Sequence, residues 1–518
     1  MDLMLVLLLP ALLFSLLLKI IFHYTTPLRT KPPSPPTGRL PPGPWRLPII
    51  GSLHHLLASP FRDQPHLALR ELSTKYGPDL MLIHLGSVPT LVVSSAEAMR
   101  EVTRAHDLTF CGRHVSPTID IITCGGKDIV FSQYGDHWRE LRKVCVLELL
   151  GQRRVLHFRP IREEEVGRVV DSISGECGGG GPINLTEKIR RMVNDIIMRA
   201  AIGRRCDEHR DELLQGIDDA LRLAGGFNLV DLYPSSMLIR RYSSPTWHMH
   251  RHRKKIYDII ASIIHERAMA LAPGTQGEDN DDDLLSVLLR LQKTSKLQFP
   301  LTDEIISAVI FDMFAAGSDT SSTTIEWAMS ELIRNPRVLH KAQLEVRDTF
   351  KGKEILTEDD MAKLTYLHLV IKETLRLHPP APFIYRQCRE TCQVMGYQVP
   401  KDTTVFVNVS AIGRDKKYWD AAEEFRPERF HNSKIDFKGT DFVYIPFGTG
   451  RRICPGIHFA QGNMELALAS FLYHFDWELP GGVNPKELDM AEAFGITVRR
   501  KSMLCLNAKR HIVSVQSN

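Results

Sequence analysis

The chain has 518 residues, of which 43% are hydrophobic and 24% are charged, and its formal net charge is +4. This near-balanced charge excludes the strong basic excess of a dedicated nucleic-acid binder, and the length allows a large buried core. The nine cysteines are scattered and include no CxxC pair, which argues against a disulfide scaffold and a zinc ribbon. We therefore expect a folded protein in a reducing compartment with no nucleic-acid partner.

The apolar pattern of residues 1–24 predicts a membrane anchor. Residues 3–22 form an apolar run interrupted by Pro10, Ser15 and Lys19, and about 20 such residues cross the hydrocarbon of a bilayer. A cleaved secretory signal is the alternative, but the run lacks a basic segment before it and an A-x-A-like site at its end. Because basic residues follow the run, the positive-inside rule places the body in the cytosol.

Residues 25–48 predict a proline-rich hinge that contains KPPSPPTGRLPPGPW. Proline cannot continue a helix, so the hinge is expected to be a semi-rigid spacer between the anchor and the body. The body is expected to cover 49–518 and to be mainly α-helical with small β-sheets. Short β-branched runs such as MLIHL and TLVVS predict strands before Val93, and helical patterns dominate from about Ala96 to Leu377.

One long central helix is predicted, with Thr302 as its N-cap and its end at Asn335. At 1.5 Å per residue this helix is about 50 Å long, so much of it must be buried. In its middle, Gly317 costs about 1 kcal/mol relative to alanine. Either small residues pack closely against another helix there, or Gly317 admits a flat ligand.

Two polar residues follow this glycine. In the second interpretation the hydroxyl of Thr320 binds the carbonyl of Ala316 and opens the helix locally. Asp319 and Thr320 then form a polar pair beside a pocket.

The sequence KETLRLHPP places Glu373 and Arg376 three residues apart on one helical face, just before the helix ends. An ordinary surface ion pair is the alternative. The sequence FRPERF follows downstream, and we expect its Arg429 to join a planar, bidentate carboxylate network that fixes the path of the chain.

The sequence PFGTGRRICPG at 446–456 surrounds a lone cysteine, Cys454, with glycines that permit close approach of another group. An inert buried cysteine is the alternative, but such a residue needs no glycine-rich surroundings. A single thiolate binds a metal usefully only if another group supplies the remaining ligands, and a haem porphyrin supplies four. The pattern therefore predicts Cys454 as a haem ligand, with Arg452 at a propionate.

Together these motifs resemble those of the cytochrome P450 family, specifically the plant microsomal A-type group. The anchor, PPGPWRLPIIGSLHHL, WRELRK, AGSDTS, ETLR, PERF and PFGTGRRICPG occur in that family's order over essentially the whole chain. The resemblance implies the cytochrome P450 fold behind an N-terminal transmembrane anchor. It also implies haem b with an axial thiolate as the cofactor.

The resemblance assigns a role to each motif residue. Haem contacts are implied for Trp138, Arg142, Arg386, Phe447, Gly448, Arg452, Cys454 and Gly456, and Cys454 is the implied metal ligand. The implied oxygen-activating pair is Thr320 with Asp319, and the implied structural triad is Glu373, Arg376 and Arg429. Tyr385 departs from the pattern, because relatives commonly have proline before the following arginine, and it is expected to reshape the substrate pocket.

The implied function is a haem monooxygenase that uses O2 and electrons from NADPH, delivered by NADPH-cytochrome P450 reductase. Its expected location is the endoplasmic reticulum membrane, single-pass, with a cytosolic catalytic domain at 49–518. A terpenoid (a sesqui- or diterpenoid) is the expected substrate, and a phenolic, flavonoid or indole compound is the alternative. A haem electron carrier or an enzyme that rearranges its substrate without O2 fits AGSDT less well.

Five segments are expected to line the substrate pocket. They are mostly apolar, which favours a small lipophilic ligand. The segments are roughly 109–131, 213–229, 310–320, 380–385 and 493–496.

Overall fold

The computed structural model describes residues 38–511 apart from 178–180, 272–282, 295–296 and 298. The expected anchor at 1–24 and much of the hinge at 25–48 therefore lie outside the described residues. Within the described part of the chain, no helix is both long enough and apolar enough to cross a membrane.

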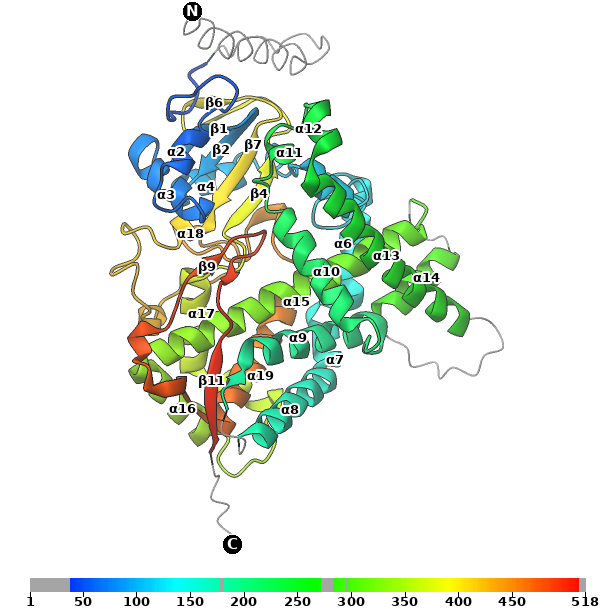
Figure 1. The fold of residues 1–518 in the computed structure, drawn as a ribbon, viewed down its shortest axis with the longest axis vertical. Coiled ribbons are helices and arrows are strands. Elements are labelled where there is room, and N and C mark those ends of the chain that lie inside the picture. Colours follow the sequence, from blue (N-terminus) through cyan, green and yellow to red (C-terminus); the bar gives the residue numbers. More distant parts are fainter. Residues whose placement is uncertain (1–37, 178–180, 272–282, 295–296, 298, 512–518) are drawn as a thin grey trace, which may run out of the picture.

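Helices form most of the body, and a sheet region occupies one end of it (Figure 1). The longer helices are α3 (Pro65–Tyr76), α8 (Arg159–Glu176), α9 (Leu185–Ile202), α10 (Arg210–Leu223), α13 (Ser244–Ala270), α14 (Leu284–Thr294), α15 (Asp303–Arg334), α16 (Pro336–Thr349), α17 (Thr365–Leu377) and α19 (Ile457–His474). Shorter helices are α2 (Leu53–Leu57), α4 (Ala96–Arg104), α5 (Pro117–Ile122), α6 (Asp136–Cys145), α7 (Gln152–His157), α11 (Leu229–Leu232), α12 (Met237–Tyr242) and α18 (Val409–Ile412). The expected helical stretch is confirmed, since α4 begins at Ala96 and α17 ends at Leu377.

The main sheet joins two strands from early in the sequence with two from late in the sequence, in the order β1–β2–β7–β4. Its strands are β1 (Leu80–Leu85), β2 (Val88–Val93), β4 (Phe383–Gln387) and β7 (Thr404–Asn408). The first two are the strands predicted before Val93, and they pair antiparallel, whereas β7 runs parallel to β2 and antiparallel to β4. Smaller sheets contain β3 (Ile183–Asn184), β5 (Cys392–Val394), β6 (Tyr397–Val399), β8 (Phe475–Glu478), β9 (Glu492–Ala493), β10 (Arg499–Arg500) and β11 (Cys505–Arg510).

Helix α15 is the predicted central helix. The side chain of Thr302 accepts a hydrogen bond from the N–H of Ile305, and Pro336 begins the next helix, α16. Most residues of α15 are buried, because the helix packs against α9, α13, α17 and α19. Figure 1 shows it running through the middle of the helical part, so its centre reaches the interior of the body.

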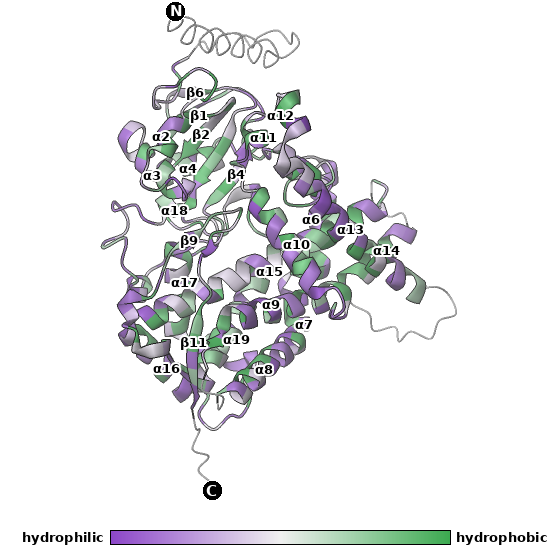
Figure 2. Ribbon diagram, in the orientation of Figure 1, coloured by the Kyte–Doolittle hydropathy of each residue, from purple (hydrophilic) through white to green (hydrophobic). Residues whose placement is uncertain are grey.

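Hydropathy follows this packing (Figure 2). Apolar residues fill β1 and β2, and the outer helices α8 and α13 carry many polar residues. One hydrophobic core joins the helices around α15, and two smaller clusters pack against the main sheet. Burial of apolar surface in these clusters is the main favourable contribution to folding.

Candidate functional site

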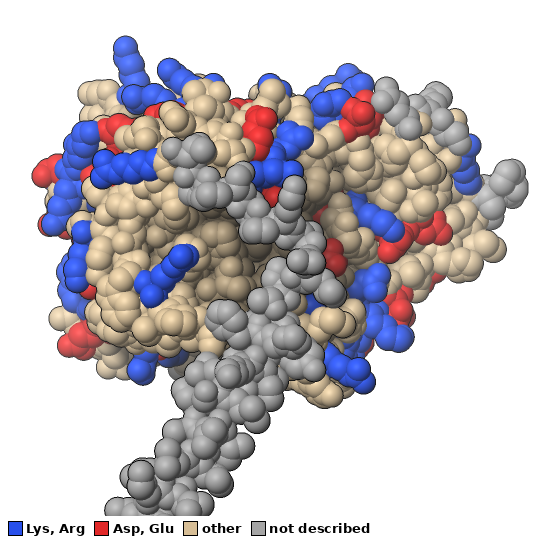
Figure 3. Space-filling model, turned by 90° about the horizontal axis from the view of Figure 1, so that it is seen from above, with Lys and Arg blue, Asp and Glu red and all other residues tan. Residues whose placement is uncertain are grey.

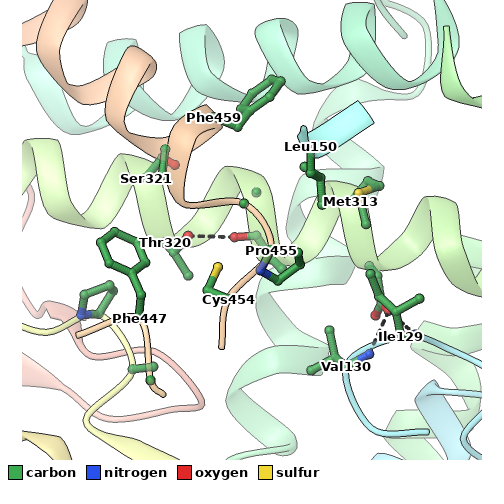
Figure 4. Close-up of a pocket in the computed structure, with 18 of the residues that line it drawn as sticks. Ile129, Val130, Leu150, Met313, Thr320, Ser321, Phe447, Cys454, Pro455 and Phe459 are labelled. Atoms are coloured by element: carbon green, nitrogen blue, oxygen red, sulfur yellow. Dashed lines mark hydrogen bonds between the residues drawn. The ribbon is translucent and has the colours of Figure 1, made fainter. Parts of the chain in front are cut away.

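A mostly apolar cavity of about 300 Å³ lies between the middle of α15, strand β4 and the loop at 446–456. From α15 it is lined by Asp312, Met313, Ala316, Gly317, Thr320, Ser321 and Thr324. Figure 4 shows the sulfur of Cys454 in this space, with Thr320 and Phe447 to one side and Ile129 and Val130 on the other.

Four of the five segments expected to line the pocket reach this cavity. They contribute residues between Arg113 and Phe131, from α15, from Pro380 to Tyr385, and Ile496. The prediction for 213–229 is wrong, since no residue of that segment lines the cavity. Its helix, α10, instead buries Leu213 and Ile217 in the helical core against α13.

Local backbone geometry directs Cys454 into the cavity. Its N–H donates to the carbonyl of Phe447 at 2.9 Å, which closes the loop on itself. Gly448 and Gly450 adopt φ values of +73° and +69°. A side chain at Gly450 would also collide with the Asp107 carboxylate, because its Cβ would lie 2.6 Å from Oδ1. The glycines are therefore required by the loop itself.

The electrostatic surroundings of Cys454 suit a metal ligand. Burial raises the pKa of its thiol, while the N–H of Gly456 and the guanidinium of Arg142 oppose that rise. A bound cation replaces the thiol proton and removes this penalty. Among the described residues, no group of three or more His, Cys, Asp or Glu side chains is placed to hold a metal ion. Within this part of the chain Cys454 therefore stands as a single possible ligand.

Arg452 lies beside the cysteine loop and is almost fully buried. Its Nε donates to the carbonyl of Cys111 at 2.9 Å and its Nη2 to that of Ser132 at 2.7 Å. The guanidinium stacks on Trp138, 4.1 Å from the ring centroid. Its Nη1 is buried and has no hydrogen-bond partner among the described residues. A buried unpaired donor costs about 1–3 kcal/mol, so an acceptor is expected there.

Three more arginines surround Arg452. Arg142 lines the cavity and donates to the carbonyl of Ile453 at 2.6 Å. Arg113 also lines the cavity, although no sequence motif marked it. Arg386 is fully buried but does not line the cavity, and it donates to the carbonyl of Thr449 at 2.7 Å.

This cluster fits the carboxylates of a porphyrin. Burial lowers the pKa of Arg452 to about 10, and the nearby Arg386 and Arg142 add to the effect. Burial and the same kind of repulsion also lower the pKa of Arg113. Concentrated positive charge with an unpaired donor favours a bound anion, and a haem places two propionates at one edge of a flat apolar ring. The residues present therefore fit haem.

Thr320 and Asp319 point in different directions. The Thr320 hydroxyl donates to the carbonyl of Ala316 at 2.7 Å, as predicted, and it lies in the cavity. Asp319 does not line the cavity; it accepts a hydrogen bond from Thr497 and pairs with Arg499 at 2.6 Å. Successive residues of a helix lie on different faces, so the two side chains do not form the expected pair beside the pocket.

Gly317 satisfies both interpretations of the small-residue segment. It lines the cavity, and a Cβ at this position would lie 2.7 Å from Cδ1 of Ile197 on α9. Close helix packing and access for a ligand therefore depend on the same missing side chain.

Glu373, Arg376 and Arg429 form the predicted network. Arg376 makes two hydrogen bonds of 2.8 Å to the Glu373 carboxylate, and Arg429 Nε adds a third of 2.9 Å. Both Glu373 and Arg376 have fully buried side chains. Arg376 also donates to the carbonyls of Gly413 and Ala422, so the network fixes the segment that leads to the cysteine loop.

Comparison with known proteins places these features in a family context. The family model for Cytochrome P450 matches residues 41–506. Dolabradiene monooxygenase of Zea mays is 50% identical over 91% of this chain and 92% of the relative. Zealexin A1 synthase of Zea mays is 48% identical over 93% of this chain and 95% of the relative. A zebra fish cytochrome P450 solved with abiraterone is similar in structure, with a TM-score of 0.71 and 25% identity over 86% of this chain and 100% of that one.

Proposed function

Because this chain belongs to the cytochrome P450 family, we propose that it hydroxylates a small terpenoid, a sesquiterpenoid or a diterpenoid, at the endoplasmic reticulum membrane. The enzyme is a haem-dependent monooxygenase that needs O2, a redox partner and a small lipophilic substrate. The observation that carries the proposal is the Cys454 thiol inside an apolar cavity, beside buried arginine donors. The terpenoids in the names of the two maize relatives, dolabradiene and zealexin A1, support the substrate class.

Haem b, held by the Cys454 thiolate, would supply reductive O2 activation and the transfer of one oxygen atom to a C–H bond. In this proposal Arg452 and Arg142 would hold the propionates, and Arg113 would add a contact that the motifs did not indicate. Trp138 would act through its ring, on which Arg452 stacks, because its indole N–H donates to the carbonyl of Ile129. Arg386 acts through the loop carbonyl of Thr449. Phe447, Gly448 and Gly456 line the cavity in which the ring would lie.

The apolar walls of the cavity exclude water and favour a hydrocarbon-like substrate. Turnover in microsomes with reductase and NADPH, on a panel of terpenoids and phenolic compounds, tests this substrate class. We expect oxidised products from at least one sesquiterpenoid or diterpenoid. Turnover confined to phenolic, flavonoid or indole compounds contradicts the proposal.

Thr320 holds a proton at its Oγ1, which donates to the carbonyl of Ala316 and lies at the cavity together with Ser321 and Thr324 of the same helix. Replacing Thr320 with valine keeps the branched shape and removes the hydroxyl. The haem spectrum and substrate affinity should remain, while product per NADPH falls about tenfold, equivalent to roughly 1.4 kcal/mol between the productive and wasteful branches. The NADPH electrons that no longer reach the product should reduce O2 to hydrogen peroxide.

The control for this experiment is Ser322→Ala. Ser322 makes the same type of bond on α15, from Oγ to the carbonyl of Ser318 at 2.7 Å, but it does not line the cavity. NADPH, peroxide and product are measured together for both variants. If product per NADPH is unchanged in Thr320→Val, the hydroxyl is not needed and Thr320 only packs the helix.

The surface at the sheet end of the body supports attachment to a membrane. Exposed apolar side chains there include Trp45, Leu57, Met237, Leu238 and Trp247. Figure 3 views this end and shows broad uncharged areas with Lys and Arg mainly toward the edge. Such a surface suits the interface of a bilayer, in which the anchor at 1–24 is proposed to lie.

The proposed electron donor is NADPH-cytochrome P450 reductase. Lys143 and Arg451 are exposed and are available to an acidic partner, although Arg451 also pairs with Asp107. Arg452 is buried and is therefore excluded from this docking role.

The catalytic domain is predicted to face the cytosol. Protease added to sealed microsomes should therefore degrade the body without detergent, while a lumenal marker stays protected. Of the two glycosylation sequons, Asn408 is fully buried and cannot report on topology, whereas Asn184 is only half-buried and should stay unglycosylated. Protection of the body until detergent is added, or a glycan on Asn184, contradicts this topology.

A further inference from the structure

One carboxylate outside the cavity binds the cysteine loop at 446–456 and has no role in the function described so far. Asp107 lies in the turn that follows α4, and its side chain is 18% exposed. The N–H of Arg451 donates to its Oδ2 at 3.3 Å, and Nε of the same arginine lies 3.2 Å from that oxygen. A side chain 344 residues earlier in the chain therefore holds the backbone of the loop.

The other oxygen of Asp107 lies beside a buried arginine. Its Oδ1 is 3.7 Å from Nη1 of Arg386, whose side chain is fully buried. This is an ion-pair distance without a hydrogen bond, and none of the described residues donates to Oδ1. Burial lowers the pKa of Arg386, and the Asp107 carboxylate opposes that shift. Since a buried cation requires a counter-ion, the negative charge of Asp107 is as important to Arg386 as its position.

Both partners of Asp107 belong to, or bind, one turn of the loop. Nη2 of Arg386 donates to the carbonyl of Thr449 at 2.7 Å. Gly450 lies between Thr449 and Arg451 with a φ of +69°, and a Cβ there would lie 2.6 Å from Oδ1 of Asp107. The glycine therefore leaves the space that the carboxylate occupies. Asp107 thus places the three residues 449–451, either directly or through Arg386.

We propose that Asp107 is a positioning residue for the haem site. It is the counter-ion that Arg386 and Arg451 share, and it fixes the turn at 449–451 from which the loop continues to Cys454. Asp107 does not line the cavity, so it acts through the two arginines and the loop backbone. The inference rests on haem ligation by Cys454 and is independent of the substrate that the enzyme oxidises.

The charge of Asp107 should lower the reduction potential of the haem. Reduction adds one negative charge to the group that the cavity holds, and positive charge nearby favours this change. Asp107 offsets the charges of Arg386 and Arg451, and Arg386 is buried, where screening by solvent ions is weak. Loss of the carboxylate should therefore leave uncompensated positive charge beside the loop and make reduction easier.

Two replacements separate the charge of Asp107 from its position. Asp107→Asn removes the charge and keeps an oxygen that accepts from the N–H of Arg451. Asp107→Ala removes both the charge and the acceptor. The control, Asp136→Asn, removes the carboxylate from an ion pair with Arg139 on α6, where both side chains are more than half exposed.

Redox titration of the purified, substrate-free holoenzyme measures the effect of the charge. In Asp107→Asn the reduction equilibrium should shift toward the reduced form by about tenfold, or about 59 mV for one electron. The control should match the wild type, because solvent screens an exposed carboxylate. A side chain that only packed the loop would not change the potential in this variant, since asparagine has nearly the shape of aspartate.

Hydrogen–deuterium exchange of a peptide that covers 447–453, in the same holoenzymes, measures the effect on position. In Asp107→Ala exchange should be about tenfold faster than in the wild type, because the N–H of Arg451 loses its acceptor. Exchange in Asp107→Asn and in the control should stay close to the wild type. Asp107→Asn should therefore change the potential alone, and Asp107→Ala should change both quantities.

Either of two results overturns the proposal. A wild-type potential in Asp107→Asn would show that the two arginines do not depend on its charge. Unchanged exchange of the 447–453 peptide in Asp107→Ala would show that the turn is held without it. If Asp107→Ala yields no holoprotein, the potential of Asp107→Asn decides alone. Neither measurement uses a substrate, so the result stands even if the terpenoid assignment fails.

Discussion

Replacement of Cys454 by alanine should abolish both the thiolate-type spectrum of the reduced CO complex and all product formation. The structure offers no second thiol in the cavity, since Cys454 is the one cysteine among the residues that line it. A haem retained by the arginines alone would have a different axial ligand and would lose the electron donation of a thiolate. Spectra of purified protein and turnover with reductase measure both losses.

The control for this variant is Cys505→Ala. Cys505 is a free cysteine on β11 and does not line the cavity, so its loss removes a thiol without touching the site. Spectrum and activity should remain in the control. A Cys454→Ala protein that still gave the thiolate-type band would falsify the assignment of the axial ligand.

Replacement of Glu373 by alanine should leave little holoprotein. It strands the guanidinium groups of Arg376 and Arg429, whose side chains are 0% and 5% exposed. Removing one partner of a buried ion pair costs about 3–5 kcal/mol, which is a large part of an ordinary folding free energy of about 5–15 kcal/mol. The segment fixed by Arg376 at Gly413 and Ala422 should loosen first, and with it the approach to the cysteine loop.

Haem content and melting temperature measure this effect, and Asp258→Ala is its control. Asp258 pairs with Lys254 on α13, where both side chains are more than half exposed. Exposed ion pairs contribute about 0–1 kcal/mol to the free energy of unfolding, so the melting temperature of the control should be close to that of the wild type. Normal haem content and unchanged melting in Glu373→Ala would reduce the triad to an unimportant ion pair.

The features that the sequence predicted correctly are those specified by local patterns. Caps and a proline mark the two ends of α15, and a glycine-rich loop surrounds Cys454. Glu373 and Arg376 meet because they lie three residues apart on one helix. In each case neighbouring residues determine the geometry.

The features that sequence reasoning missed depend on contacts between distant segments. Asp319 turns from the cavity because Thr497 and Arg499, from the end of the chain, satisfy its carboxylate. Arg113 reaches the cavity through hydrogen bonds to its loop and to the carbonyl of Tyr385 on β4. No spacing within one segment encodes such pairings. The pairing of β2 with β7 is of the same kind.

Tyr385 shows how one departure from a motif affects the pocket. Its ring lines the cavity and packs on Phe406, with ring centroids 5.0 Å apart. Its hydroxyl reaches the carbonyl of Gly225 at 3.5 Å, so the side chain spans from the sheet to the segment after α10. The expectation that Tyr385 shapes the pocket agrees with this position.

The central claim is that this chain transfers one atom of O2 to a terpenoid. The most direct test is turnover of the active terpenoid under oxygen-18 gas, with reductase and NADPH, followed by mass spectrometry of the product. The product should carry one oxygen-18 atom, and none when the label is supplied as water. A product that takes its oxygen from water, or that forms equally well without O2, would contradict the account.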